Sequence, residues 1–138
     1  MKSSPKKFQA VVVSVKDMAR EFLRDHNKVI LFNGRLCPPV LEDICTCHKL
    51  RKALKEPICS GDTLTIAGLA KSSKQEFVVT KVGSVVFETL SELGHCTIVF
   101  SMDGEDIEIM PGELLVNGKP KRILVNDVIT IWSGEKNE

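Results

Sequence analysis

The stretch that decides the fold runs from Val82 to Phe100 and reads VGSVVFETLSELGHCTIVF. Apolar residues at its start give way to a polar, helix-like turn around Glu88 to Glu92. Gly94 ends this turn, because a glycine at a helix end can adopt the left-handed conformation at little steric cost. An alternating strand follows from His95 to Phe100. The stretch therefore predicts a strand end, a short helix, a tight glycine exit and a buried strand.

Short strands separated by turn signals account for most of the remaining chain. We expect strands over residues 7–15, 29–32, 63–70, 75–81, 97–101, 106–110, 113–116, 120–124 and 128–132. The dipeptides Asp103-Gly104 and Asn117-Gly118 predict hairpins between the strands that flank them. A short helix is expected over residues 16–26, with Asp17 able to cap its start. We therefore predict a mostly β protein: a small closed or partly closed barrel of short antiparallel strands with two or three short helices.

Length and composition favour one domain without a polyanionic partner. A chain of 138 residues with 43% hydrophobic residues suits a single core, so we expect a disordered tail over residues 1–6 and one domain over 7–138. Lys and Arg number 19 against 18 Asp and Glu, and the net charge of +1 gives no reason to expect nucleic acid as a partner. Five cysteines, an odd number, argue against a closed disulfide framework.

The cellular location follows from segments that the sequence lacks. Apolar runs such as Ala10–Val13 are far shorter than the ~20 residues that a membrane-spanning helix needs. The basic stretch Met1–Lys7 has no apolar core of the kind found in signal peptides. We therefore expect a cytoplasmic protein that does not insert directly into the membrane.

The decisive stretch also carries a family resemblance. The residues concerned are Val82-Gly83-Ser84-Val85, Glu92-Leu93-Gly94-His95 and Thr97, followed by Pro111-Gly112, Val116 and Gly118. In this order and spacing they resemble the glucitol/sorbitol-specific IIA component of the bacterial phosphotransferase system. The resemblance extends over roughly residues 8–132 and is strongest over 82–118. It implies a phosphotransferase component that receives a phosphoryl group from the histidine phosphocarrier protein and passes it to the IIB and IIC membrane components of a hexitol transporter, without a cofactor.

If a histidine carries the phosphoryl group, the chain offers three candidates. His26 lies at the polar end of the first expected helix, where a solvated histidine is the usual finding. His95 opens a buried strand, where a structural histidine that donates to a backbone carbonyl is the simpler interpretation. His48 lies in Cys45-Thr46-Cys47-His48 and is the strongest candidate for a chemical role.

The residues after His48 suggest a cationic surface around it. Arg51, Lys52 and Lys55 follow His48 at i+3, i+4 and i+7, which would place all four on one exposed face of a helix. Positive charge beside a histidine suits a site that holds a phosphoryl group, since phosphoryl transfer depends chiefly on positioning and charge stabilisation. An ordinary solvated basic helix explains the same pattern.

The resemblance assigns the phosphohistidine to His48. In the family this histidine follows a Leu-Glu-acidic segment and a cysteine, and here Leu41-Glu42-Asp43 and Cys45 precede His48. The resemblance further implies a covalent phosphoryl group on the tele nitrogen, Nε2, after nucleophilic attack by the neutral imidazole. The other ring nitrogen then needs an acceptor, which we seek at Glu42, at Asp43 or at a backbone carbonyl.

Two alternatives from other classes stay open at the level of sequence. Cys45, Cys47 and His48 could form a zinc centre with Cys37 or Cys59, although one residue between Cys45 and Cys47 is tighter than the usual spacing. The chain could also be a non-enzymatic β-barrel adaptor. Zinc content distinguishes the first alternative, and phosphate uptake from the phosphocarrier distinguishes the second.

Overall fold

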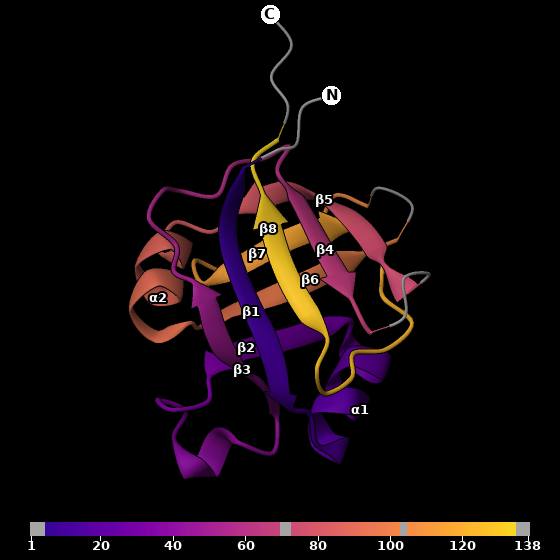
Figure 1. Cartoon of the computed structure of the whole chain (residues 1–138). Coiled ribbons are helices and arrows are strands. Elements are labelled where there is room, and N and C mark those ends of the chain that lie inside the picture. The colour runs from indigo at the N-terminus through magenta and orange to yellow at the C-terminus, as the bar shows by residue number, and fades with distance from the viewer. Residues whose placement is uncertain (1–4, 70–72, 103–104, 135–138) are drawn as a thin grey trace, which may run out of the picture.

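Eight strands form a closed barrel in the computed structural model, which describes residues 5–69, 73–102 and 105–134 (Figure 1). The strands are β1 (Lys6–Ser14), β2 (Lys28–Asn33), β3 (Cys45–Lys52), β4 (Thr63–Ala67), β5 (Gln75–Val82), β6 (Cys96–Ser101), β7 (Glu113–Asn117) and β8 (Val128–Trp132). The helices are α1 (Asp17–His26), α2 (Val86–Leu93) and a 3-10 turn over Pro39–Leu41. The predicted class, a mostly β barrel with short helices, is confirmed.

The strand order around the barrel is β1-β3-β2-β6-β7-β5-β4-β8, and β8 pairs with β1 to close it. Closure leaves no exposed sheet edge among these strands. Most neighbouring strands are antiparallel, as expected. Two pairs, β2 with β3 and β6 with β7, are parallel. The parallel pairs matter for the site, because they place Asn33 of β2 beside His48 of β3.

Alternating side chains of the strands fill the barrel. On β1, Phe8, Ala10 and Val12 point inward and are fully buried, and Ile129 and Ile131 of β8 do the same. This alternation gives the strands other than β3 one apolar face, and closure turns these faces toward one core. Because aromatic residues are few, β-branched and leucine side chains make up most of that core.

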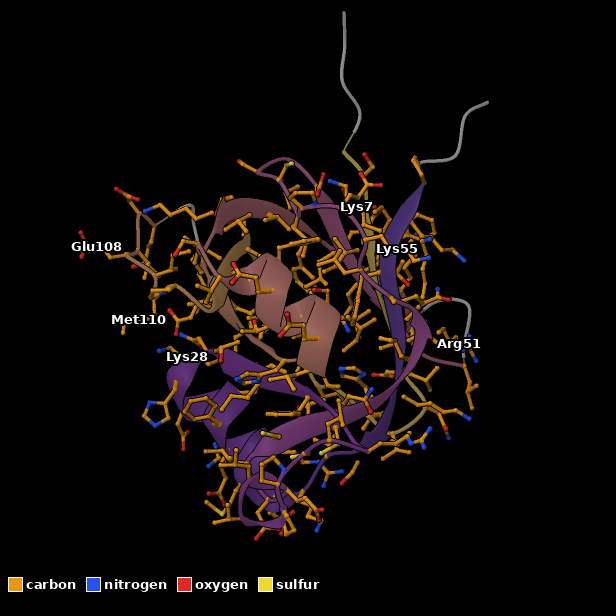
Figure 2. The ribbon with its side chains drawn as sticks, turned by 90° about the vertical axis from the view of Figure 1, so that its left-hand side faces the viewer. Lys7, Lys28, Arg51, Lys55, Glu108 and Met110 are labelled. Atoms are coloured by element: carbon orange, nitrogen blue, oxygen red, sulfur yellow. The ribbon has the colours of Figure 1, made fainter. Side chains whose placement is uncertain are left out.

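The decisive stretch folds as its sequence predicts. α2 ends at Gly94, whose φ of 64° is left-handed, and β6 begins two residues later. Val86 and Leu90 form the buried face of α2. Figure 2 shows α2 lying across the side of the barrel, beside the end of β3 that extends beyond β2.

Three local predictions are wrong. Residues 45–52 form β3 instead of a helix, because β1 and β2 pair with this segment on its two sides and that pairing outweighs the helical spacing of its charges. Residues 106–110 and 120–124 form no strands. β6 and β7 pair with each other in parallel, so the expected hairpins on either side of them do not form. The dipeptide Asp103-Gly104 lies outside the described residues.

Two smaller predictions concern the ends of elements. Lys16, and not Asp17, occupies the cap position of α1, and no side-chain cap bond forms there. Of the predicted tail, residues 1–4 lie outside the described ranges, whereas Lys6 already belongs to β1. In the described part of the chain, no helix is long and apolar enough to cross a bilayer.

Candidate functional site

His48 lies inside the barrel on β3. In the sheet register it is opposite Val12 of β1 and Asn33 of β2, and its side chain is only 1% exposed. The ring of Phe8 meets the His48 imidazole edge-on, with the ring centroids 5.8 Å apart. The expectation of an exposed histidine on a helix is therefore wrong, because the inward face of a barrel strand is the buried face.

The imidazole of His48 is held by the end of α2. Its Nε2 lies 2.8 Å from the carbonyl oxygen of Gly94. A carbonyl can only accept, so Nε2 carries the proton and donates it. Nδ1 then holds the free lone pair of a neutral ring, and it is buried without a hydrogen-bond partner among the described residues. Burial lowers the pKa of His48 below its ordinary value of 6.5, although the bond to Gly94 opposes this shift.

Gly94 must be a glycine for a second reason besides its backbone angle. A Cβ at this position would lie 2.7 Å from Cε1 and 2.9 Å from Nε2 of His48, and 3.0 Å from Cβ of Asn33. Any side chain here would push the imidazole away from the carbonyl that binds it. The sequence identified Gly94 as a helix end, but contained no signal for its contact with a histidine forty-six residues earlier.

His95 is the structural histidine that its position predicts. Its Nδ1 donates to the carbonyl oxygen of Leu31 at 3.0 Å, and its ring stacks on Phe32 with centroids 4.5 Å apart. The ring is half-buried. The peptide group between Gly94 and His95 links the backbone of His95 to the side chain of His48, because its oxygen accepts from the His48 imidazole. Its N–H donates to the carbonyl oxygen of Thr89 in α2 at 3.2 Å.

The charged residues expected around His48 lie elsewhere. Glu42 and Asp43 face Lys16, with separations of 4.0 Å and 3.5 Å, and neither contacts the histidine. Arg51 is exposed on β3, and Figure 2 shows it at the outer edge of the molecule. The cationic helical face is not formed, because successive residues of a strand point to opposite sides. The acceptor that we expected for Nδ1, at Glu42, at Asp43 or at a backbone carbonyl, is not found among the described residues, and the carbonyl of Gly94 accepts from Nε2 instead.

The cysteines do not assemble a metal centre with His48. Cys45 and Cys47 pack with Cys37 and Phe32 in a small cluster separate from the main core. Burial raises the pKa of the Cys45 thiol to about 12 and that of Cys47 to about 11. Cys59 is exposed on a distant loop. Within the described ranges, no group of three or more His, Cys, Asp or Glu is placed to hold a metal ion.

Comparisons with known proteins connect this barrel to a family. The family model "PTS system glucitol/sorbitol-specific IIA component" matches residues 7–130. A crystal structure described as the PTS system IIA component from Enterococcus faecalis V583 has the same fold, with a TM-score of 0.74 and 20% identity over 91% of this chain and 99% of the other. The comparison with curated proteins finds no match. Since the family model covers nearly the whole chain, the chain belongs to the glucitol/sorbitol-specific IIA family, a family of phosphoryl carriers in the sugar phosphotransferase system.

Proposed function

We propose that this protein accepts a phosphoryl group on His48 from the histidine phosphocarrier protein and passes it to the IIB component of a glucitol/sorbitol transporter. The observation that carries the proposal is a neutral, buried imidazole at the residue that we match to the phosphohistidine of the family. The exchange takes place in the cytoplasm, between the phosphocarrier and the IIB and IIC components at the membrane.

The chemistry needs an unprotonated ring nitrogen. The lowered pKa keeps His48 neutral at physiological pH, so a lone pair is available for attack on phosphorus. As the new N–P bond forms, the N–P bond of the donor phosphohistidine breaks and its electron pair returns to the donor imidazole. In the second step a nucleophile of the IIB component, which we take to be a cysteine thiolate, attacks the phosphorus, and His48 becomes a neutral imidazole again.

In this conformation neither ring nitrogen of His48 is accessible for phosphoryl transfer. Nε2 donates to Gly94, and Nδ1 is buried, so an incoming phosphorus atom can reach neither nitrogen. Attack by Nε2 requires the Gly94 carbonyl to withdraw and the proton to move to Nδ1. Loss of one such hydrogen bond costs about 0.5–1.5 kcal/mol, a small fraction of the stability of a domain. We therefore propose that the last turn of α2, which carries Gly94, moves away from His48 when the phosphocarrier docks.

Intact-mass analysis tests the proposal. The protein is incubated with phosphoenolpyruvate, enzyme I and the phosphocarrier, and we expect the wild type to gain one acid-labile, base-stable phosphoryl group. His48→Gln should gain none, because glutamine can still donate to the Gly94 carbonyl but has no nucleophilic nitrogen. His26→Gln is the matched control, since His26 is exposed and should leave labelling unchanged.

The outcomes separate the proposal from its alternatives. Labelling that persists in folded His48→Gln but disappears in His95→Asn would refute His48 as the acceptor and keep the family function. A wild type that gains no phosphoryl group, with competent carriers and an active control IIA protein, would refute phosphoryl transfer and favour the adaptor function.

A further inference from the structure

A cavity of about 340 Å³ lies at the end of the barrel beneath α1. Its floor is formed by apolar side chains, namely Val15, Ala19, Leu23, Val29 and Ile123. They come from the link between β1 and α1, from the inner face of α1, from β2 and from the segment between β7 and β8, which passes beside α1 (Figure 1). The volume falls within the range of about 300–1,000 Å³ that is usual for small-molecule sites, and barrel mouths are frequent places for them.

All charged side chains at the rim of this cavity are basic. Arg20, Arg24, Lys119, Lys121 and Arg122 line it, and no Asp or Glu of the described residues belongs to the lining. Five of the chain's 19 Lys and Arg thus gather at one opening of a protein whose net charge is only +1.

Some basic side chains of the rim are paired with carboxylates of the protein, and others are not. Arg20 and Arg24 face Asp17 and Asp25 on α1, at 3.7 Å and 2.9 Å, and Lys119 donates to the carbonyl oxygen of Arg24 at 3.2 Å. The side chains of Lys121 and Arg122 make no ion pair within the ranges that the structure describes. The uncompensated positive charge therefore lies on the segment between β7 and β8, which lines the same cavity as the apolar floor.

We propose that this cavity binds an amphipathic anion, whose apolar body occupies the floor and whose single anionic head lies against Lys121 and Arg122. A medium-chain carboxylate has this chemistry. Burial of the alkyl chain supplies most of the affinity, because it removes apolar surface from water, and the rim selects for negative charge. A free sugar does not fit, because its hydroxyl groups would lose their water without finding partners on this floor.

The cavity also touches the strand of the proposed phosphoryl acceptor. Thr46 of β3 is buried, lines the cavity and precedes His48 by two residues, so both side chains point to the same side of the strand. Occupancy should therefore be visible at β3 as well as at α1. Binding itself is independent of phosphoryl transfer, and it is measured without it.

The test is a titration of the ¹⁵N-labelled full chain with sodium decanoate, followed by amide chemical shifts. We expect saturable one-to-one binding, with the largest shifts at Ala19, Val29, Thr46 and Ile123. Three control ligands are titrated in the same way. Decanol has the alkyl tail without the charge, acetate has the carboxylate without the long tail, and decyltrimethylammonium has the tail with a positive head. Each should bind more weakly than decanoate, and added salt should weaken decanoate binding. Equal affinity for decanoate and decyltrimethylammonium, or shifts spread over the whole surface, would overturn the proposal.

Matched variants locate the site. Lys121→Glu/Arg122→Glu should weaken decanoate binding by about tenfold, because two favourable pairs become two repulsive ones. Lys52→Glu/Lys55→Glu changes the net charge equally at two exposed lysines outside the lining and should leave affinity within about twofold. Ala19→Phe fills the floor and should abolish binding, whereas Met18→Phe, on the exposed side of α1, should not. If both charge-reversal variants lost affinity equally, or if folded Ala19→Phe bound normally, the assignment would be wrong.

Discussion

Replacement of Gly94 by alanine tests the contact on which the site depends. The new Cβ would lie 2.7 Å from Cε1 and 2.9 Å from Nε2 of His48, and the residue would have to keep a φ of 64°. A left-handed backbone costs a residue with a Cβ about 1–2 kcal/mol. Forcing an extra methyl group into a packed interior costs a further ~1–3 kcal/mol. We therefore expect the free energy of unfolding to fall by about 2–5 kcal/mol.

Two other glycines of the chain separate these contributions. Gly61 has a φ of 97°, and a Cβ added there would meet no described atom within 4 Å, so Gly61→Ala isolates the backbone cost. A Cβ at Gly112 would be equally free of contacts, and this glycine has no positive φ, so Gly112→Ala should be close to neutral. Urea unfolding of the three variants, followed by circular dichroism, should rank their losses of stability as Gly94→Ala, then Gly61→Ala, then Gly112→Ala.

The steric part can be assigned to His48 by a double-mutant cycle. A His48→Ala background removes both imidazole contacts and leaves only the approach to Cβ of Asn33 at 3.0 Å, so Gly94→Ala should cost little more than its backbone component. The coupling free energy between the two substitutions should then be about 1–3 kcal/mol. A Gly94→Ala variant no less stable than Gly61→Ala, or a coupling near zero, would refute the contact between Gly94 and the imidazole.

Three further predictions concern His48, the Lys7–Asp62 ion pair and the cysteines. Because burial lowers the pKa of folded His48, the unfolded state binds a proton more readily than the folded state. The contribution of His48 to stability is therefore complete above the ordinary pKa of 6.5, and it should decline as pH falls from there toward the lower folded pKa. Urea midpoints measured against pH should show this decline in the wild type and not in His48→Gln. Lys7 and Asp62 form an ion pair of 2.8 Å with both side chains at most 5% exposed, so Lys7→Met should cost about 3–5 kcal/mol in the same assay and Lys7→Arg much less. Iodoacetamide should label Cys59 well before the other cysteines, because the remaining thiols are buried; peptide mapping that shows early labelling of Cys45 would contradict this burial.

Local sequence signals were sufficient where neighbours in the chain determine structure. Gly94 marks the end of α2, because the left-handed residue after a helix needs no information from distant parts of the chain. The mostly apolar run Val128–Trp132 marks a buried strand for the same reason. The helix prediction around His48 was wrong, because the helical spacing of the charges is a local signal. Residues 45–52 form a strand through pairing with β1 and β2, which is not local.

The sequence by itself determined a barrel of short strands, a family and three candidate histidines. Only the tertiary structure decided the environment of those histidines. Closure of the barrel turned the inward face of β3 into its core, which buried His48 and brought it to the carbonyl of Gly94. The same closure placed α1 over the barrel end and collected basic residues from two distant segments at one cavity. Burial, tautomer and pKa depend on contacts between residues far apart in the chain, and such contacts exist only after the fold has formed.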